Sequence, residues 1–126
     1  MKELIIKKCM KCGAMVKVLE DCNCENCGIK CCGEEMKQLI PNSIEASVEK
    51  HVPTYEVKDG EIFVTVNHVM EDEHFIEWIS IVRGNKECTT YLKPGELAVA
   101  HCKYAPETII YAYCNKHGLW KKEVED

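Results

Sequence analysis

The chain has 126 residues, 46% of them hydrophobic, which suffices for one ordinary domain or for one modest domain and a small module. Its net charge of −5 and its pI of about 5.6 argue against a nucleic-acid-binding protein, which usually carries a basic stripe. No run of about eighteen apolar residues is present, so the sequence predicts no membrane-spanning segment.

The ten cysteines fit either a secreted disulfide scaffold or an intracellular metal protein. The opening stretch MKELIIKKC lacks the apolar region and the small-residue cleavage site of a secretory signal peptide. We therefore expect a cytoplasmic protein whose thiols stay reduced, and clustered thiols in that compartment mostly bind metal.

Seven of the ten cysteines lie between Cys9 and Cys32, in a segment poor in large apolar residues. A module of this size cannot rely on a core of its own and needs a metal or a partner. Residues 37–48, with Pro41 and Asn42, are typical of a connector. The sequence thus predicts a metal-binding module over residues 1–37 and a second domain over residues 38–126.

Two cysteine pairs in the first module have the spacing of metal ligands. Cys9 and Cys12 form a C-x-x-C knuckle, and Cys31 and Cys32 are adjacent; each pair is followed by a glycine. Four thiolates close a tetrahedral site that suits zinc or a single iron. Adjacent cysteines are unusual in zinc ribbons, and this favours iron.

Three further cysteines, Cys22, Cys24 and Cys27, lie between these pairs. They can serve as extra ligands that support an iron–sulfur cluster, or they can be free thiols of a loop insertion. Cys24 and Cys27 also form a C-x-x-C unit that can replace one of the outer pairs. We favour the outer four cysteines as the ligand set and leave these alternatives open.

The second part of the chain has the pattern of short β-strands. Asp59-Gly60 is a hairpin dipeptide inside residues 55–66, and residues 75–82 alternate with many aromatic and β-branched side chains. Residues 97–104 and 108–114 are further strand candidates, and Lys93-Pro94-Gly95 is a turn. Without a convincing long helix, this spacing predicts an antiparallel sandwich or barrel.

Four of the five histidines lie near turn signals or expected strand ends. His68 and His74 flank a short turn that can place both imidazoles on one side. Cys114 and His117 have ligand spacing, with a glycine after the histidine for a tight bend. His51 precedes Val52-Pro53, which favours an extended approach to a strand. A lone histidine is usually a surface or core residue, so the grouping carries the metal hypothesis.

These motifs resemble a known family. The segments EKHVP at 49–53, His68-x5-His74 with FIEW at 75–78, YLKPG at 91–95 and CNKHGLW at 114–120 resemble the catalytic domain of superoxide reductases. The two cysteine pairs, the second within CCGEEM at 31–36, resemble the desulforedoxin-type module of desulfoferrodoxins. The resemblance covers nearly the whole chain.

The resemblance implies a mainly β protein with an immunoglobulin-like sandwich and a small desulforedoxin-like N-terminal module. It implies a non-haem iron with four equatorial imidazoles and one axial thiolate, from His51, His68, His74, His117 and Cys114. It also implies a rubredoxin-like iron on the four cysteines, a homodimer, and an electron donor such as rubredoxin. The activity it implies is the one-electron reduction of superoxide to hydrogen peroxide without oxygen production.

The resemblance assigns catalytic roles to two neighbouring residues. Glu49 is the carboxylate that binds the oxidised iron and leaves on reduction, and Lys50 attracts superoxide and helps to organise proton delivery. Without His51 beside them, these two residues would read as a solvated charge pair. The family often has His-Pro-Met where this chain has His68-Val69-Met70, and the extra cysteines also depart from the usual pattern.

Two other functions remain open at this point. A non-catalytic electron-transfer or iron-binding protein would keep both metals but lack an open iron position. A structural zinc module joined to a β-sandwich interaction domain would hold zinc and no iron. His101, Cys88, Cys102, Trp78 and Trp120 are interpreted as structural residues.

Overall fold

The computed structural model describes residues 3–25 and 27–125, and it describes Glu49 without its side chain. The chain divides into two compact units, one of Leu4–Ile40 and one of Met1–Glu3 with Pro41–Asp126. The sequence places the boundary between residues 37 and 38, and that placement stays a prediction. In the described part of the chain, no helix is long and apolar enough to cross a membrane.

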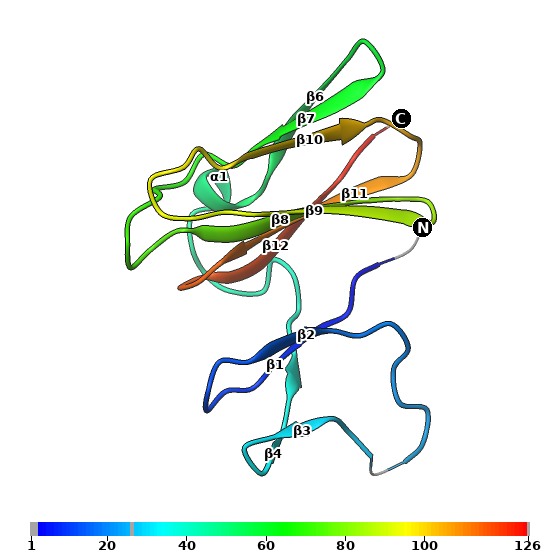
Figure 1. Cartoon of the computed structure of the whole chain (residues 1–126), viewed down its shortest axis with the longest axis vertical. Helices are drawn as coiled ribbons and strands as arrows, with labels where there is room; N and C mark the ends of the chain where they lie inside the picture. Colours follow the sequence, from blue (N-terminus) through cyan, green and yellow to red (C-terminus); the bar gives the residue numbers. More distant parts are fainter. Residues whose placement is uncertain (1–2, 26, 126) are drawn as a thin grey trace. The chain divides into compact units, whose positions relative to one another are not determined.

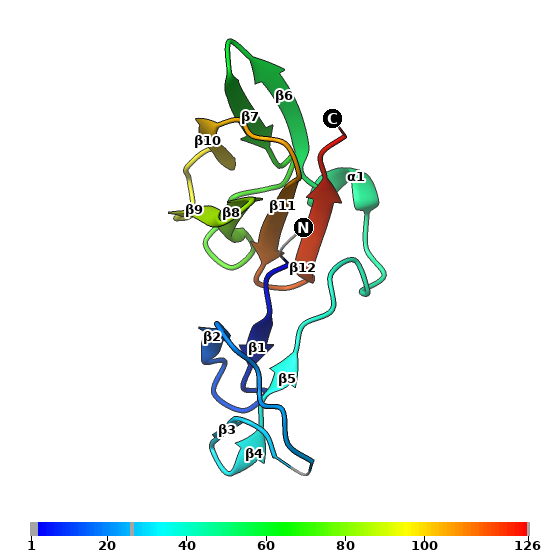
Figure 2. The same cartoon turned by 90° about the vertical axis from the view of Figure 1, so that its right-hand side faces the viewer.

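The smaller unit is built from very short antiparallel strands. Strands β1 (Ile6–Lys8), β2 (Met15–Lys17) and β5 (Lys37–Gln38) form one sheet in the order β2-β1-β5. Strands β3 (Lys30–Cys31) and β4 (Glu34–Glu35) form a separate hairpin (Figure 2). The ligand-type cysteines lie at the two hairpin turns, Cys9 and Cys12 between β1 and β2, and Cys31 and Cys32 at the β3–β4 turn.

The larger unit is a two-layer antiparallel sandwich (Figure 1). One sheet has the order β10-β7-β6 and the other the order β12-β11-β8-β9. The strands are β6 (Thr54–Lys58), β7 (Glu61–Thr65), β8 (Ile76–Arg83), β9 (Lys86–Tyr91), β10 (Val99–Lys103), β11 (Thr108–Cys114) and β12 (Gly118–Glu123). The first, second and fifth strands of the unit thus share one sheet, as in immunoglobulin-like sandwiches, and the predicted fold class is confirmed.

Turn chemistry explains the strand boundaries. Asp59 and Gly60 both have positive φ, 53° and 79°, as a two-residue hairpin between β6 and β7 requires. Gly95, at φ 87°, lies in the turn before β10, where the amide of Glu96 donates to the carbonyl of Lys93 at 3.1 Å. The predicted strands therefore begin and end close to their expected positions.

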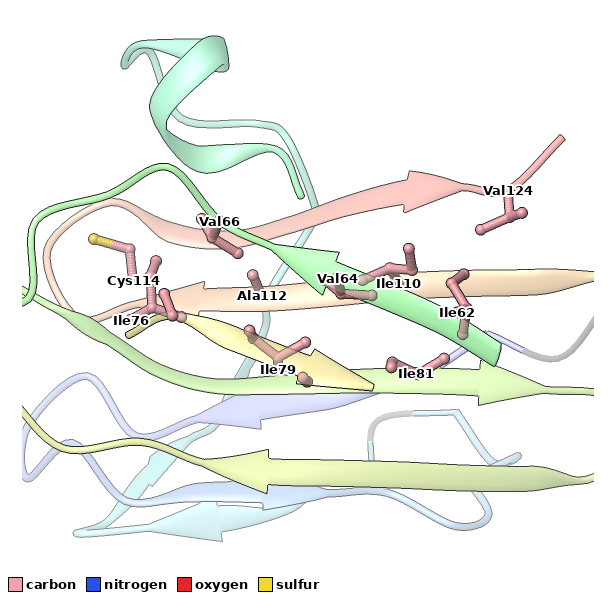
Figure 3. Close-up of a cluster of buried hydrophobic side chains, with 12 residues drawn as sticks. Ile62, Val64, Val66, Ile76, Ile79, Ile81, Ile110, Ala112, Cys114 and Val124 are labelled. Carbon is pink, nitrogen blue, oxygen red and sulfur yellow. The ribbon is translucent and has the colours of Figure 1, made fainter. Parts of the chain in front are cut away.

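The core of the sandwich lies between the two sheets. Alternate residues of β7 point inward, so that Ile62 and Val64 are fully buried while their neighbours are exposed. They meet inward side chains of β8 and β11, and the cluster contains Ile76, Ile79, Ile81, Ile110, Ala112 and Cys114 (Figure 3). Cys114 lies at one end of this cluster, so the apolar core runs up to a sulfur (Figure 3).

A single turn of helix, α1 (Val48–His51), precedes the first strand of the sandwich. The sequence indicates an extended approach here, and Val52 does have extended backbone angles, φ −72° and ψ 126°. His51 is the last helical residue because Pro53 disfavours the helical conformation in the residue before it. The helix therefore sets the position of His51 immediately before β6.

Candidate metal centres

Five side chains from three separate segments converge at one end of the sandwich. His51 ends α1, His68 and His74 lie in the loop between β7 and β8, and Cys114 and His117 bracket the turn between β11 and β12. Their ligand atoms all lie within 4.8 Å of one another. The structure thus brings together every member of the predicted histidine–cysteine set.

The four imidazoles form a closed ring of neighbours. The ring centroid of His51 is 4.8 Å from the ring centroid of His68 and also 4.8 Å from that of His117. The centroid of His74 is 4.5 Å from that of His68 and 5.1 Å from that of His117. Each ring therefore has two neighbours, which is the arrangement of the corners of a square.

One nitrogen pair indicates the angle between neighbouring ligands. Nε2 of His51 lies 3.0 Å from Nδ1 of His117. Two nitrogens bound at about 2.1 Å are about 3.0 Å apart at a right angle and about 3.4 Å apart at the tetrahedral angle. The shorter separation fits a square set of nitrogens better than the tetrahedral geometry that structural zinc prefers.

The sulfur of Cys114 lies next to opposite corners of this square. It is 3.4 Å from Nε2 of His68 and 3.8 Å from Nδ1 of His117, which do not neighbour each other in the ring. A donor close to opposite corners lies above or below the square rather than in it. Cys114 is completely buried, whereas His68, His74 and His117 are half-buried. His51 is also buried, and the sulfur of Cys114 therefore lies on the core side of the square.

A bulge places this sulfur. The register between β11 and β8 shifts after Tyr113, which pairs with Trp78, so that Cys114 pairs with Ile76. Bulges bend a strand and re-aim a side chain, and they are frequent next to functional sites. Here the shift places Ile76 in the same core cluster as Ile79 and Cys114.

Backbone carbonyls orient two of the imidazoles. Nδ1 of His51 donates to the carbonyl oxygen of Ser47 at 2.7 Å, and Nδ1 of His68 donates to that of Val69 at 2.6 Å. Each bond leaves Nε2 unprotonated and directed at the cluster, as metal ligation requires. The sequence did not reveal these partners, because a carbonyl contact leaves no residue-type signal.

Burial keeps these rings neutral. Desolvation lowers the pKa of His51, His68 and His74 below the usual 6.5, and neighbouring imidazoles lower it further. A neutral imidazole offers a lone pair, whereas a protonated one cannot bind a metal. The cluster is therefore prepared to accept a cation at neutral pH.

One orphan atom indicates that a cation belongs here. Among the residues that the structure describes, Nε2 of His74 is a buried nitrogen without any hydrogen-bond partner. Leaving a buried polar atom unpaired is costly, and a metal ion at the centre of the square would satisfy it. With four neutral nitrogens and one thiolate around it, the donor set fits non-haem iron.

Other groups near the square carry positive charge. Lys50, exposed at the end of α1, contributes to the lowered pKa of both His51 and His68 through its charge. Lys116, which the sequence interpretation did not single out, does the same for His74. The side chain of Glu49 lies outside the described residues, so its predicted role as a ligand stays a prediction.

The four outer cysteines form a second cluster in the smaller unit. The sulfurs of Cys9, Cys12, Cys31 and Cys32 lie within 4.8 Å of one another. The sulfur of Cys31 is 3.7 Å from that of Cys12 and 3.9 Å from that of Cys32. Sulfurs bound at about 2.3 Å to one tetrahedral ion are about 3.8 Å apart. The spacing therefore fits a single metal ion.

The pKa values of these thiols indicate that the cluster binds a metal ion. Backbone amides of Cys12 and Lys11 hydrogen-bond to the sulfur of Cys9 and lower its pKa to about 7. Hydrogen bonding with the sulfurs of Cys12, Cys9 and Cys32 raises the pKa of Cys31 to about 12. Without a cation these thiols do not all ionise together, whereas a bound metal ion compensates the charge of four thiolates.

The extra cysteines stand apart from this cluster. Cys24 and Cys27 are joined as a disulfide, and Cys22 is free and exposed. None of the three belongs to the group of four sulfurs that converge. Cys88 and Cys102, on β9 and β10, likewise lie outside both clusters.

Comparison with known proteins agrees with this arrangement. A family model described as Desulfoferrodoxin matches residues 43–123. The chain is 39% identical over 129 residues to the desulfoferrodoxin of Desulfarculus baarsii, covering 97% of this chain and 98% of that protein. It is 38% identical over 122 residues to the desulfoferrodoxin of Nitratidesulfovibrio vulgaris, covering 94% of each chain.

The fold also matches a solved structure. The crystal structure of the superoxide reductase from Treponema pallidum superposes with a TM-score of 0.73 at 22% identity, covering 96% of this chain and 99% of that one. At this identity the likeness shows the fold alone, and membership rests on the sequence matches above. On those matches, this chain belongs to the desulfoferrodoxin family.

Proposed function

We propose that this protein is a superoxide reductase, which reduces superoxide to hydrogen peroxide without forming oxygen. The observation that carries the proposal is the square of four imidazoles, three of them partly exposed, with the buried thiolate of Cys114 on the core side. A site with one face toward the surface can admit a small anion, whereas a purely structural metal site is closed.

The reaction needs one electron and two protons for each superoxide. His51, His68, His74, His117 and Cys114 would hold a non-haem iron, which would supply the electron in its ferrous state. The four imidazoles are neutral ligands, so the thiolate of Cys114 is the one negative charge that the protein contributes. The site therefore keeps a net positive charge that favours an anionic substrate.

Surface charge around the site supports substrate attraction. Lys50 and Lys116 are exposed cations whose fields reach the imidazoles. A cationic rim raises the local concentration of a small anion and its rate of encounter. We assign Lys50 to this attraction and to proton delivery, and Glu49, its neighbour in the sequence, as a carboxylate ligand of the oxidised site.

The four-cysteine cluster fits a second iron of the rubredoxin type. The sulfur separations support a single ion rather than an iron–sulfur cluster, and the adjacent Cys31 and Cys32 favour iron over zinc. A single iron with four thiolates suits electron transfer. The family resemblance further suggests a small electron donor such as rubredoxin and a homodimer. The ligand thiols, which must stay reduced, suit the cytoplasm.

The test is to mix the reduced, iron-loaded protein with superoxide. We expect rapid oxidation of the iron, one hydrogen peroxide for each superoxide consumed, and no oxygen. His74→Gln removes one corner of the square and should abolish the fast phase. His101→Gln, which removes an exposed imidazole on β10, is the matched control and should react like the wild type.

Each other result points to a different function. Oxygen evolution together with peroxide would indicate a dismutase. Iron that stays reduced in the presence of superoxide would indicate an electron-transfer or iron-binding protein. Metal analysis with a visible spectrum should find two irons in each chain with ferric–thiolate absorption; a colourless zinc protein would contradict the proposal.

A further inference from the structure

The segment between β2 and β3 carries chemistry that neither metal centre uses. It contains Cys22, Cys24 and Cys27, and none of them reaches the four-sulfur cluster. Cys24 and Cys27 are bonded to each other as a disulfide. The side chain of Cys24 is exposed, that of Cys27 is half-buried, and the free thiol of Cys22 is exposed. A solvent-accessible disulfide thus lies in the same unit as the thiolate metal site.

The start of this segment is anchored. One carboxylate oxygen of Asp21 accepts hydrogen bonds from the side chain of Lys7 and from the backbone amide of Cys22, both at 2.8 Å. Lys7 belongs to β1 and its side chain is largely buried. The cysteines that follow Asp21 are therefore attached at a defined point to the sheet of the module.

The Cys24–Cys27 disulfide contributes little to the stability of the fold. It links residues only three positions apart, and closing so short a loop removes little entropy from the unfolded chain. Disulfides that stabilise small domains usually join distant segments, whereas exposed ones are the labile, regulatory or catalytic ones. The C-x-x-C spacing is also that of disulfide oxidoreductases, in which one thiol is activated and the other resolves.

We propose that Cys24 and Cys27 form a redox-active dithiol–disulfide couple that is oxidised by hydrogen peroxide and reduced by dithiol compounds or small dithiol proteins. The proposal rests on the proposed function in one respect, because the peroxide is the product of superoxide reduction. The couple is a third redox site of the protein, separate from both metal centres in its residues and in its chemistry.

The oxidation balances with peroxide alone. The thiolate of Cys24, the more exposed of the two, attacks one oxygen of hydrogen peroxide; the O–O bond breaks, and a sulfenic acid and water result. The thiol of Cys27 then attacks this sulfur, the S–S bond forms, and the S–O bond breaks to release a second water. Two electrons pass from two sulfurs to the two peroxide oxygens.

The return step consumes one external dithiol. Its first thiolate attacks the disulfide and forms a mixed disulfide, and its second thiol completes the exchange, so that Cys24 and Cys27 regain their protons. The sulfur of Cys27 lies 2.9 Å from the carbonyl oxygen of Cys24, to which the reduced thiol can donate a hydrogen bond. The same contact keeps the sulfur of Cys27 beside the backbone of Cys24, within reach of a sulfenic acid formed there.

The experiment uses the full chain with both metal centres loaded. The protein is reduced with dithiothreitol, freed of the reductant, treated with one equivalent of hydrogen peroxide, and alkylated for peptide mass analysis. We expect the peptide with Cys24 and Cys27 to lose about 2 Da and to escape alkylation. Renewed dithiothreitol treatment should restore both thiols.

Serine variants separate the couple from its neighbours. Cys24→Ser should abolish disulfide formation and leave superoxide reduction unchanged, because Cys24 lies outside both ligand groups. Cys22→Ser is the matched control and should form the disulfide like the wild type. The proposal is wrong if peroxide leaves both thiols of the wild type open to alkylation. It is also wrong if Cys24→Ser loses one equivalent of metal, because Cys24 would then be a metal ligand.

A second arm distinguishes this proposal from the proposed function. Superoxide replaces added peroxide, with and without catalase, and disulfide formation that catalase suppresses links the couple to the product. If added peroxide forms the disulfide but superoxide yields no peroxide, the redox-couple proposal is supported and the proposed superoxide reductase function is wrong. If superoxide is reduced normally while added peroxide leaves both thiols free, the function stands and the couple fails.

Discussion

The side-chain carbonyl of Asn115 accepts a hydrogen bond from the backbone amide of Phe75 at 3.1 Å. The same side chain donates to the carbonyl of Glu73 at 2.9 Å, so it contacts the backbone on both sides of His74. Asn115 itself follows Cys114 in the turn that leads to His117. One amide side chain therefore joins the loop of one imidazole ligand to the turn that holds the thiolate and another imidazole.

Replacing Asn115 should loosen this connection. Asn115→Ala leaves the amide of Phe75 and the carbonyl of Glu73 without their partner, and we expect a loss of about 1–3 kcal/mol in the free energy of unfolding. Iron should also be lost faster to a chelator. Denaturant unfolding and chelator competition measure the two effects, with Asn85→Ala in the exposed β8–β9 turn as the control. Equal iron loss in both variants would contradict the positioning role.

Gly118 is constrained both by its backbone and by its surroundings. Its φ is +80°, and a Cβ there would lie 2.7 Å from Cδ1 of Ile44. Gly118→Ala should lower the free energy of unfolding by about 1–3 kcal/mol through backbone strain. The clash should add a smaller cost, because it meets the end of the exposed Ile44 side chain, which can move.

Two variants separate these causes. Gly84→Ala, at φ +54° with open space around it, carries the strain alone and should cost less. Adding Ile44→Ala to Gly118→Ala should recover part of the loss, because it removes the clash. No recovery would mean that the clash does not contribute.

Lys50 should act through long-range attraction. Lys50→Ala should slow the reaction with superoxide by about tenfold at low ionic strength, and the difference should shrink as salt is added. Lys58→Ala, which removes the same charge from the exposed end of β6, is the control. Stopped-flow measurements at several salt concentrations compare the rates of Lys50→Ala and the wild type. If the ratio of these rates does not change with salt, Lys50 acts locally in proton delivery rather than through long-range attraction.

The buried imidazoles should make the metal-free protein sensitive to acid. The pKa of His51, His68 and His74 is lowered in the folded state, so the unfolded chain binds protons first as the pH falls below about 6.5. The free energy of unfolding should therefore be constant with respect to these groups above that pH and fall below it.

Denaturant unfolding of the metal-free protein between about pH 8 and pH 5 measures this effect. His74→Gln should flatten the acid limb of the curve, since one of the contributing rings is gone. A stability that rises on acidification would contradict the burial argument. In the iron-loaded protein, acid should also release the metal, because protons compete for the same nitrogens.

The four-cysteine centre can be tested independently of the other. Cys12→Ser should remove one metal equivalent from each chain and leave superoxide reduction by the chemically reduced protein largely intact. Cys22→Ser should retain both metals, because Cys22 is not among the converging sulfurs. Metal analysis with visible spectra compares them; loss of metal in Cys22→Ser would show that the ligand set extends into the β2–β3 segment.

Local sequence was informative where a turn dictates the structure. Asp59-Gly60 predicts the β6–β7 hairpin, and both residues take the positive φ that this turn needs. The bulge at Tyr113 and Cys114 was not predictable, because it is a register shift between two strands that are distant in the sequence. The helical turn that ends at His51 was missed, since four residues carry no periodicity.

The sequence by itself determined the kinds of donor, four neutral imidazoles and a set of thiols, together with the tight turns that hold several of them, because residue chemistry and turn conformation are local properties. The family resemblance implied four imidazoles around an axial Cys114, but only the tertiary structure brought these side chains together in a square with Cys114 beneath it and left Cys24 and Cys27 outside the sulfur cluster. These outcomes depend on how the two sheets pack and on strand register, which bring together residues far apart in the chain.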